Sequence, residues 1–175
     1  MVDAVQVEGE SGQLFANTLA MIYPSKLKGK HCMEGLIRHL WANAYGPSAG
    51  NVETVVAGLD QSLIFEPREP AQYISQISKL IELFREGLVR PLPFFPNASL
   101  AWLIQTKKHE EKKPRANAKS PTACARDSWN SDQGGEGKEF ATNLCFPDDP
   151  WELEETKQTN KTIMEFLGEG GSFIQ

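Results

Sequence analysis

The chain has 175 residues, of which 40% are apolar, so we expect one hydrophobic core with an appendage. Its net charge of −5 and isoelectric point near 5.3 argue against a general nucleic-acid grip, which needs a basic field. No segment approaches the roughly 18 apolar residues of a membrane span, and the N-terminus lacks the layout of a secretion signal. The 3 cysteines are far apart and suggest neither disulfides nor a zinc site. We therefore expect a cytoplasmic protein without a membrane partner.

The first part of the chain reads as strands followed by a helix. Residues 2–7 alternate apolar and polar side chains, and a second run over residues 14–23 follows a glycine-rich turn, which together predict a hairpin. Pro24 ends the second strand because it has no N–H to donate to a ladder. Apolar side chains at helical spacing then predict a helix over residues 30–45.

A second strand pair and a second helix come next. Residues 52–57 and 62–65 have strand character, and residues 71–86 carry their apolar side chains on one helical face, with Pro70 suited to the first turn. Two single-faced helices beside alternating strands must bury their apolar stripes on a sheet. The sequence therefore predicts an α/β fold of the α+β kind, with a small mixed sheet and packed helices.

A proline-braced apolar bend separates the second helix from a third. Pro91, Pro93 and Pro96 forbid a continuing helix and hold the residues between them extended. Asn97 is a good N-cap for the helix that follows. Such a bend normally packs against something, either in this chain or in a partner. The side chains that we expect to anchor it are Leu92, Phe94, Phe95 and Trp102.

The chain changes character after residue 105. A locally basic run with few apolar residues favours a solvated helix end that leads into a mobile loop, and a phosphate-contacting patch is the alternative. In that alternative, the candidate DNA contacts are Lys107, Lys108, Lys112, Lys113 and Arg115. We accordingly divide the chain into an α/β core over residues 1–105, a mobile basic and glycine-rich connector over 106–140, and a C-terminal helical extension over 141–175.

Residues that could carry chemistry are scattered. His31 and His39 lie two turns apart on one predicted helix with no other ligand beside them, so we expect surface histidines. The acids within residues 148–155 are explained by the helix dipole and by solvation better than by a metal. Glu-x-Lys recurs, but never in a predicted strand, where a metal nuclease needs its acid and lysine. The sequence predicts no metal or cofactor site.

Several motifs together resemble a known family. They are Tyr23-Pro24-Ser25 at the end of a strand, REGLVRPLPFFPNASLAW over residues 85–102, Ala125 to Trp129, Gly135-Glu136-Gly137, and Phe146-Pro147-Asp148-Asp149-Pro150-Trp151. Their order, and the elements between them, resemble the C-terminal domain of the exodeoxyribonuclease V gamma subunit, the RecC family. The resemblance runs from about residue 19 to residue 166 and is most specific between residues 84 and 102.

The resemblance implies that the core is a partial, degenerate PD-(D/E)XK nuclease-like domain that has lost its catalytic set. Ile22 takes the place of the acid and Pro24 that of the lysine, and neither can bind a metal or polarise water. Asp3 is left as a lone match to the other acid. The resemblance also implies that the chain starts after the first helix and strand of that fold, as a fragment of a larger subunit.

Three functions remain open at this point. The resemblance implies a non-catalytic scaffold or DNA-guiding domain of a RecBCD-type helicase–nuclease, which acts in double-strand-break repair and recombination with RecB-like and RecD-like subunits and with DNA. The first alternative is an active metal-dependent PD-(D/E)XK nuclease that uses Asp3 with a Glu-x-Lys pair. The second is a protein-binding domain unrelated to DNA, which docks through the proline-braced bend.

Overall fold

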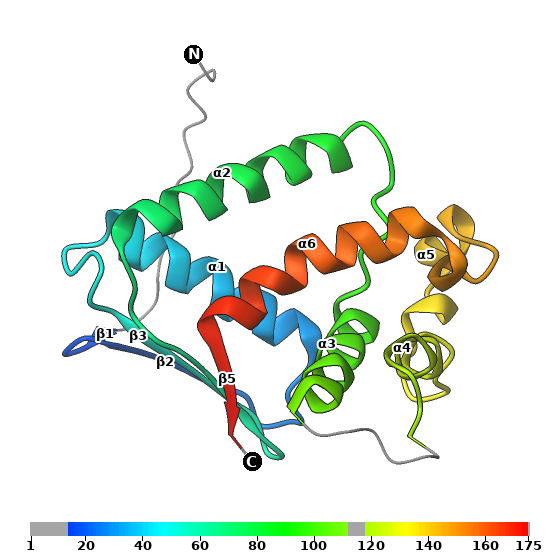
Figure 1. Ribbon diagram of the computed structural model, residues 1–175, viewed down its shortest axis with the longest axis horizontal. Coiled ribbons are helices and arrows are strands. Elements are labelled where there is room, and N and C mark those ends of the chain that lie inside the picture. Colours follow the sequence, from blue (N-terminus) through cyan, green and yellow to red (C-terminus); the bar gives the residue numbers. More distant parts are fainter. Residues whose placement is uncertain (1–13, 112–117, 175) are drawn as a thin grey trace.

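The computed structural model describes residues 14–111 and 118–174, which form a mixed α/β fold with one sheet and helices gathered on one side of it (Figure 1). Within these residues the sheet has 5 strands, which follow one another across it in chain order. The predicted fold class, a mixed sheet with packed helices, is confirmed. The strand predicted over residues 2–7 lies outside the described residues.

The structure divides the strand predicted over residues 14–23 into a tight hairpin. β1 (Leu14–Phe15) pairs antiparallel with β2 (Thr18–Ile22), so only Ala16 and Asn17 connect them. Ala16 has a φ of 54°, the left-handed conformation that lets a two-residue loop reverse the chain. The prediction of one continuous strand over residues 14–23 is therefore wrong.

A helical crossover joins two parallel strands at the centre of the sheet. α1 (Gly29–Tyr45) leads from β2 to β3 (Glu53–Ala57), which lies parallel to β2 with Leu19 opposite Thr54. β4 (Ser62–Phe65) then returns antiparallel beside β3. The first predicted helix and the predicted strand pair are confirmed.

The sheet buries one face and exposes the other. On the helix side, alternate strand residues such as Leu19, Val56 and Phe65 are buried. On the opposite face Ile22 and Ile174 are exposed. The alternation follows from the two-residue period of a strand, and it places the main core between the sheet and the helices.

α2 (Pro70–Gly87) packs on α1, and its apolar stripe loses cover toward the C-terminal end of the helix. Tyr73 is 1% exposed and Ile77 is 9% exposed, whereas Phe84, further along the same stripe, is 67% exposed. The helix predicted over residues 71–86 is confirmed, with Pro70 in its first turn. Leu80, Ile81 and Leu83 still pack on the main core as partly buried side chains, and Phe84 lies outside it.

The stretch after the bend is more structured than the sequence predicts. α3 (Pro96–Glu111) crosses the predicted boundary at residue 105. α4 (Pro121–Trp129) and the 3-10 turn η1 (Glu136–Lys138) lie within the predicted connector, and α4 packs along α3. Ser120 caps α4 by accepting a hydrogen bond from the N–H of Ala123, so the sequence did hold a helix-start signal here.

The end of the chain returns to the sheet. α5 (Phe140–Cys145) and the 3-10 turn η2 (Pro150–Glu152) precede α6 (Glu154–Gly170), which packs against α3 and α1. β5 (Gly171–Ile174) then pairs antiparallel with β4. The region predicted as a helical extension therefore also contributes a strand.

Candidate functional site

The end of β2 exposes hydrocarbon where the resemblance places the degenerate catalytic positions. Ile22 is 81% exposed, and Pro24 is exposed as well. Neither side chain has an oxygen or nitrogen that could bind a metal. Between them, Tyr23 stacks on His31 with 3.8 Å between ring centroids and donates a hydrogen bond from its hydroxyl to Glu34 at 2.8 Å. Burial and this carboxylate raise the pKa of Tyr23 to about 12.

The two histidines of α1 are buried, so the expectation of surface histidines is wrong. His31 is 7% exposed and His39 is 2% exposed. His39 Nδ1 lies 3.0 Å from the hydroxyl of Thr54 and 3.2 Å from the amide nitrogen of Asn43. Burial, with a smaller effect from Arg68, lowers the pKa of His39 to about 4. A neutral imidazole therefore fills the space between α1 and the sheet at pH 7.

Aromatic packing anchors the proline-braced bend within the chain. Phe95 is 3% exposed and meets Trp129 edge to face, with 4.3 Å between ring centroids. Phe146 and Trp151 complete an aromatic cluster around Phe95, which forms a second hydrophobic core beside the main one. Phe94 packs instead on the main core between the sheet and the helices. Two adjacent phenylalanines therefore join the two hydrophobic cores.

Buried polar contacts fasten the bend to α6. The side-chain amide of Asn160 donates a hydrogen bond to the carbonyl of Pro93 at 2.8 Å, and its oxygen accepts one from the hydroxyl of Ser99. Asn160 and Ser99 are both buried. Leu92 and Trp102, the other two predicted anchors, are half-buried, and Trp102 packs on both cores.

A buried carboxylate holds the first turn of α3. Glu136 is 7% exposed, and its two oxygens accept hydrogen bonds from the N–H of Asn97 at 2.9 Å and the N–H of Ala98 at 3.0 Å. The side chain of Asn97 in turn accepts a hydrogen bond from the N–H of Gly29 at 3.0 Å. The sequence predicts Asn97 as the cap of α3, but Asn97 lies inside α3 and caps α1.

This cap arrangement brings two helix N-termini into contact. A Cβ at Gly29 would lie 1.9 Å from the carbonyl oxygen of Pro96, so the close approach of α1 and α3 requires glycine. Burial raises the pKa of Glu136, although the two N–H groups that it accepts from act in the opposite direction. No local sequence pattern identifies Glu136 as a cap, because its partners lie more than 35 residues earlier in the chain.

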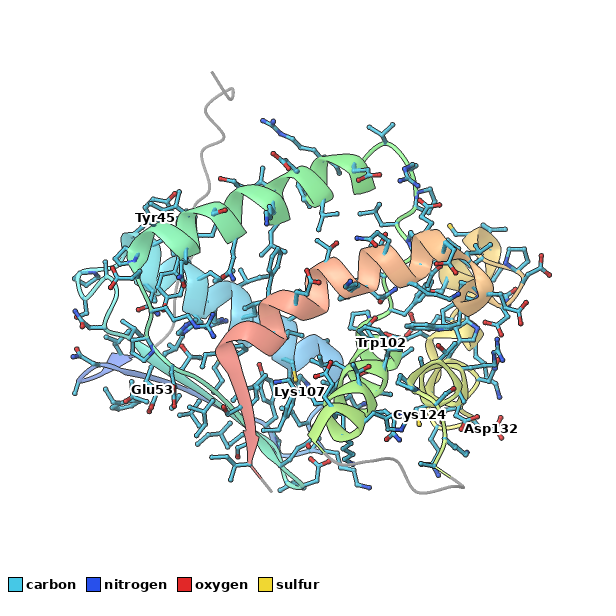
Figure 2. All side chains as sticks on the ribbon, viewed as in Figure 1. Tyr45, Glu53, Trp102, Lys107, Cys124 and Asp132 are labelled. Carbon is cyan, nitrogen blue, oxygen red and sulfur yellow. The ribbon has the colours of Figure 1, made fainter. Side chains whose placement is uncertain are left out.

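The structure describes two of the five candidate DNA-contacting side chains, Lys107 and Lys108. Lys107 donates a hydrogen bond to the carbonyl of Gly171 at 3.0 Å, and its Nζ lies 5.8 Å from the centroid of the Phe173 ring (Figure 2). It therefore fastens α3 to β5. Lys108 is exposed. Lys112, Lys113 and Arg115 lie outside the described residues.

The carboxylates of the described residues do not gather into a metal site, and several of them bind structural partners. Over residues 14–111 and 118–174, no group of 3 or more His, Cys, Asp or Glu side chains is placed to hold a metal ion. Glu136 serves as a helix cap, and Glu155 pairs with Arg90, so two of the Glu-x-Lys acids have structural partners. Asp3 lies outside the described residues. None of the described helices is long and apolar enough to cross a membrane.

The sheet, the β2–α1–β3 crossover and the apolar end of β2 define a mixed α/β domain without a metal-ligating cluster in the part of the chain that the structure describes. Residues 1–107 match the model of the RecC C-terminal domain, and the chain belongs to this family. The resemblance to RecC is therefore confirmed, and it connects the chain with the RecBCD complex and DNA repair. A search of curated proteins found no match.

Proposed function

We propose that this chain is a non-catalytic domain of a RecBCD-type helicase–nuclease, which supports the assembly and guides DNA strands during double-strand-break repair and recombination in the cytoplasm. Its partners would be RecB-like and RecD-like subunits and the DNA that the complex unwinds. Membership of the RecC C-terminal domain family supports this assignment. The core would be a degenerate form of the PD-(D/E)XK nuclease fold, an idea supported by the mixed sheet and its helical crossover.

The observation that carries the proposal is the chemistry at the end of β2. A metal nuclease needs at least two oxygen ligands to fix the ion and a neighbouring group to support the attacking water. Ile22 and Pro24 present only hydrocarbon there. The carboxylate of Glu34 is engaged by Tyr23 and by Arg38.

A nuclease assay tests the absence of catalysis. The purified chain is incubated with linear duplex and single-stranded DNA in Mg²⁺ or Mn²⁺, beside an Asp3→Ala variant. We expect no cleavage by either protein, because a single carboxylate binds Mg²⁺ poorly without further ligands. Cleavage that disappears in Asp3→Ala would establish an active nuclease instead.

A co-purification experiment tests the role in assembly. The chain is expressed together with RecB-like and RecD-like subunits, and the complex is isolated through a tag on either partner. Retention of the chain is the expected result. Failure to co-purify would favour a protein-binding domain unrelated to the helicase–nuclease.

A further inference from the structure

Three lysines lie on the short segment that links β2 to α1. Lys26, Lys28 and Lys30 are all exposed, whereas Leu27 between the first two is only 6% exposed. Lys28 has an extended backbone, with a φ of −108° and a ψ of 156°. Because side chains alternate along an extended chain, Lys26 and Lys28 project on the side opposite Leu27, and their Cα atoms are about 7 Å apart. We call residues 26–30 the lysine segment.

The β3–β4 turn holds the lysine segment in place. Asp60 accepts a hydrogen bond from the N–H of Leu27 at 2.7 Å, and the N–H of Leu59 donates to the carbonyl of Ser25 at 2.9 Å. A Cβ at Gly58 would lie 2.6 Å from the nitrogen of Leu27, so the two backbones are in direct contact. Figure 1 shows the link between β2 and α1 beside the β3–β4 turn, near the lower edge of the molecule. The lysines therefore project from a fixed backbone.

The positive charge of the lysine segment is not neutralised by ion pairs within the described residues. None of the ion pairs there includes its three lysines. Glu34, one turn into α1, pairs with Arg38 at 2.8 Å and accepts the hydroxyl of Tyr23. Asp60 accepts the N–H of Leu27. The chain carries a net charge of −5, yet residues 22–31 contain these lysines and no acid.

The surroundings of the lysine segment combine this charge with hydrocarbon. Burial lowers the pKa of His31, the charges of Lys30 and Lys28 lower it further, and the charge of Glu34 acts in the opposite direction. Ile22 is 81% exposed just before the segment, and Leu59 is 77% exposed on the turn that contacts it. Phosphates and unstacked bases together would satisfy such a surface.

We propose that the lysine segment, with Ile22 and Leu59, is a contact surface for single-stranded DNA. The lysines bind backbone phosphates, and the two hydrocarbon side chains contact bases that are no longer paired. Duplex DNA offers phosphates without unstacked bases and fits the surface less well. The inference rests on the proposed function, and it assigns DNA contact to the β2–α1 link instead of the basic run after residue 105.

Fluorescence anisotropy with a labelled oligothymidine strand, titrated with the full chain at several salt concentrations, tests the proposal. The triple variant Lys26→Gln, Lys28→Gln, Lys30→Gln is expected to lower the slope of log K against log salt by about 2, since each lost phosphate contact on a single strand contributes about 0.7. Affinity at low salt should fall about tenfold or more. The matching triple arginine variant should bind as the wild type does. A triple glutamine variant at Lys108, Lys112 and Lys113 should also bind normally.

The melting temperature should be unchanged, because the three lysines are exposed. If the triple variant melts lower, the single glutamine variants provide the same test, each with a slope reduced by about 0.7. The proposal would be overturned if the wild type did not bind the strand at low salt or bound duplex DNA more tightly. It would also be overturned if the lysine-segment variant kept the wild-type salt slope, or if the Lys108, Lys112, Lys113 variant lost as much affinity.

Co-purification with the helicase subunits separates this inference from the proposed function. The triple variant at the lysine segment is expected to assemble as the wild type does while its affinity for the strand is reduced. If the wild type does not assemble but its strand binding depends on the lysine segment, the proposed function fails and the contact surface stands. If it assembles but its strand binding does not depend on the lysine segment, only the contact surface is rejected.

Discussion

The carboxylate of Glu136 accepts a hydrogen bond at 2.9 Å from the N–H of Asn97, although 39 residues separate them in the chain. The side chain of Asn97 in turn accepts a hydrogen bond from the N–H of Gly29, so Glu136 is linked through Asn97 to the start of α1. The family match ends at residue 107, so a residue outside the match caps the first turn of α3, a helix that begins inside it. The C-terminal third of the chain is thus part of the same folded unit as the matched domain.

Replacing Glu136 should destabilise the fold. Glu136→Ala is expected to lower the free energy of unfolding by about 2–4 kcal/mol, because two buried N–H groups lose their acceptor. Glu136→Gln keeps one acceptor oxygen and should cost about half as much. Urea denaturation at pH 7 measures both, with the exposed Glu139→Ala as a control that should change stability by less than about 0.5 kcal/mol. Equal denaturation midpoints for the wild type and all these variants would show that the hydrogen bonds of Glu136 do not stabilise the fold.

His39 should make stability depend on pH below neutrality. Its folded-state pKa of about 4 lies below the ordinary value of 6.5, so the unfolded chain binds a proton at pH values where the native protein does not. The contribution of neutral His39 is therefore fully present above pH 6.5 and is lost as the pH falls toward 4, by about 3 kcal/mol in all.

The measurement is urea denaturation of the wild type and of His39→Gln between pH 4 and pH 7.5. The difference in unfolding free energy between the two proteins should change in favour of the glutamine variant as the pH falls. A difference that stays constant over this range would mean that His39 does not titrate on unfolding.

Phe95 should contribute far more stability than an exposed phenylalanine. Phe95→Ala is expected to cost about 3–5 kcal/mol, because the ring is buried against Trp129. Phe94→Ala should cost less, since Phe94 is half-buried. Phe140→Ala is the matched control, because this ring is 83% exposed, and should change stability by less than about 0.5 kcal/mol. If Phe95→Ala matched Phe140→Ala in chemical denaturation, the aromatic cluster would not anchor the bend.

Two trypsin sites within the predicted connector should resist cleavage in the native protein. Arg126 lies in α4 and pairs with Asp149 and Glu152, and Lys138 ends η1 and pairs with Asp132. Proteases cut backbone that can leave its folded conformation, so helical residues held by packing should be cleaved late. Mass spectrometry of the earliest fragments, beside a digest in denaturant, measures the order. First cleavage at Arg126 would show that α4 opens readily.

The sequence predicted those elements whose signal is periodic and local. α1 and α2 carry apolar stripes at helical spacing, and β3 and β4 alternate, so their positions follow from side-chain pattern alone. The predicted strand over residues 14–23 failed because the reversal depends on a positive φ at Ala16, a residue that rarely adopts it. β5 was missed because a short strand after glycines gains its conformation from pairing with β4.

The candidate sites were harder to predict because their contacts are not local. The cap by Glu136 joins segments distant in sequence, and the burial of His39 depends on which face of α1 meets the sheet. Lys107 appeared as a member of a basic run, but its long side chain reaches β5. Ile22 and Pro24 are exposed at the end of β2, and their role as degenerate catalytic positions stays a prediction.

The pairing of β5 with β4 also covers an edge of the sheet. The last strand occupies the hydrogen-bonding edge of β4, with Gly171 opposite Phe65 and Phe173 opposite Leu63. A fragment cut at residue 107, where the family match ends, would leave that edge bare beside two buried apolar side chains. Free edges of this kind recruit strands from other molecules. β5 thus protects this edge of the sheet from pairing with other molecules. Shortening the chain to its matched region would remove that protection.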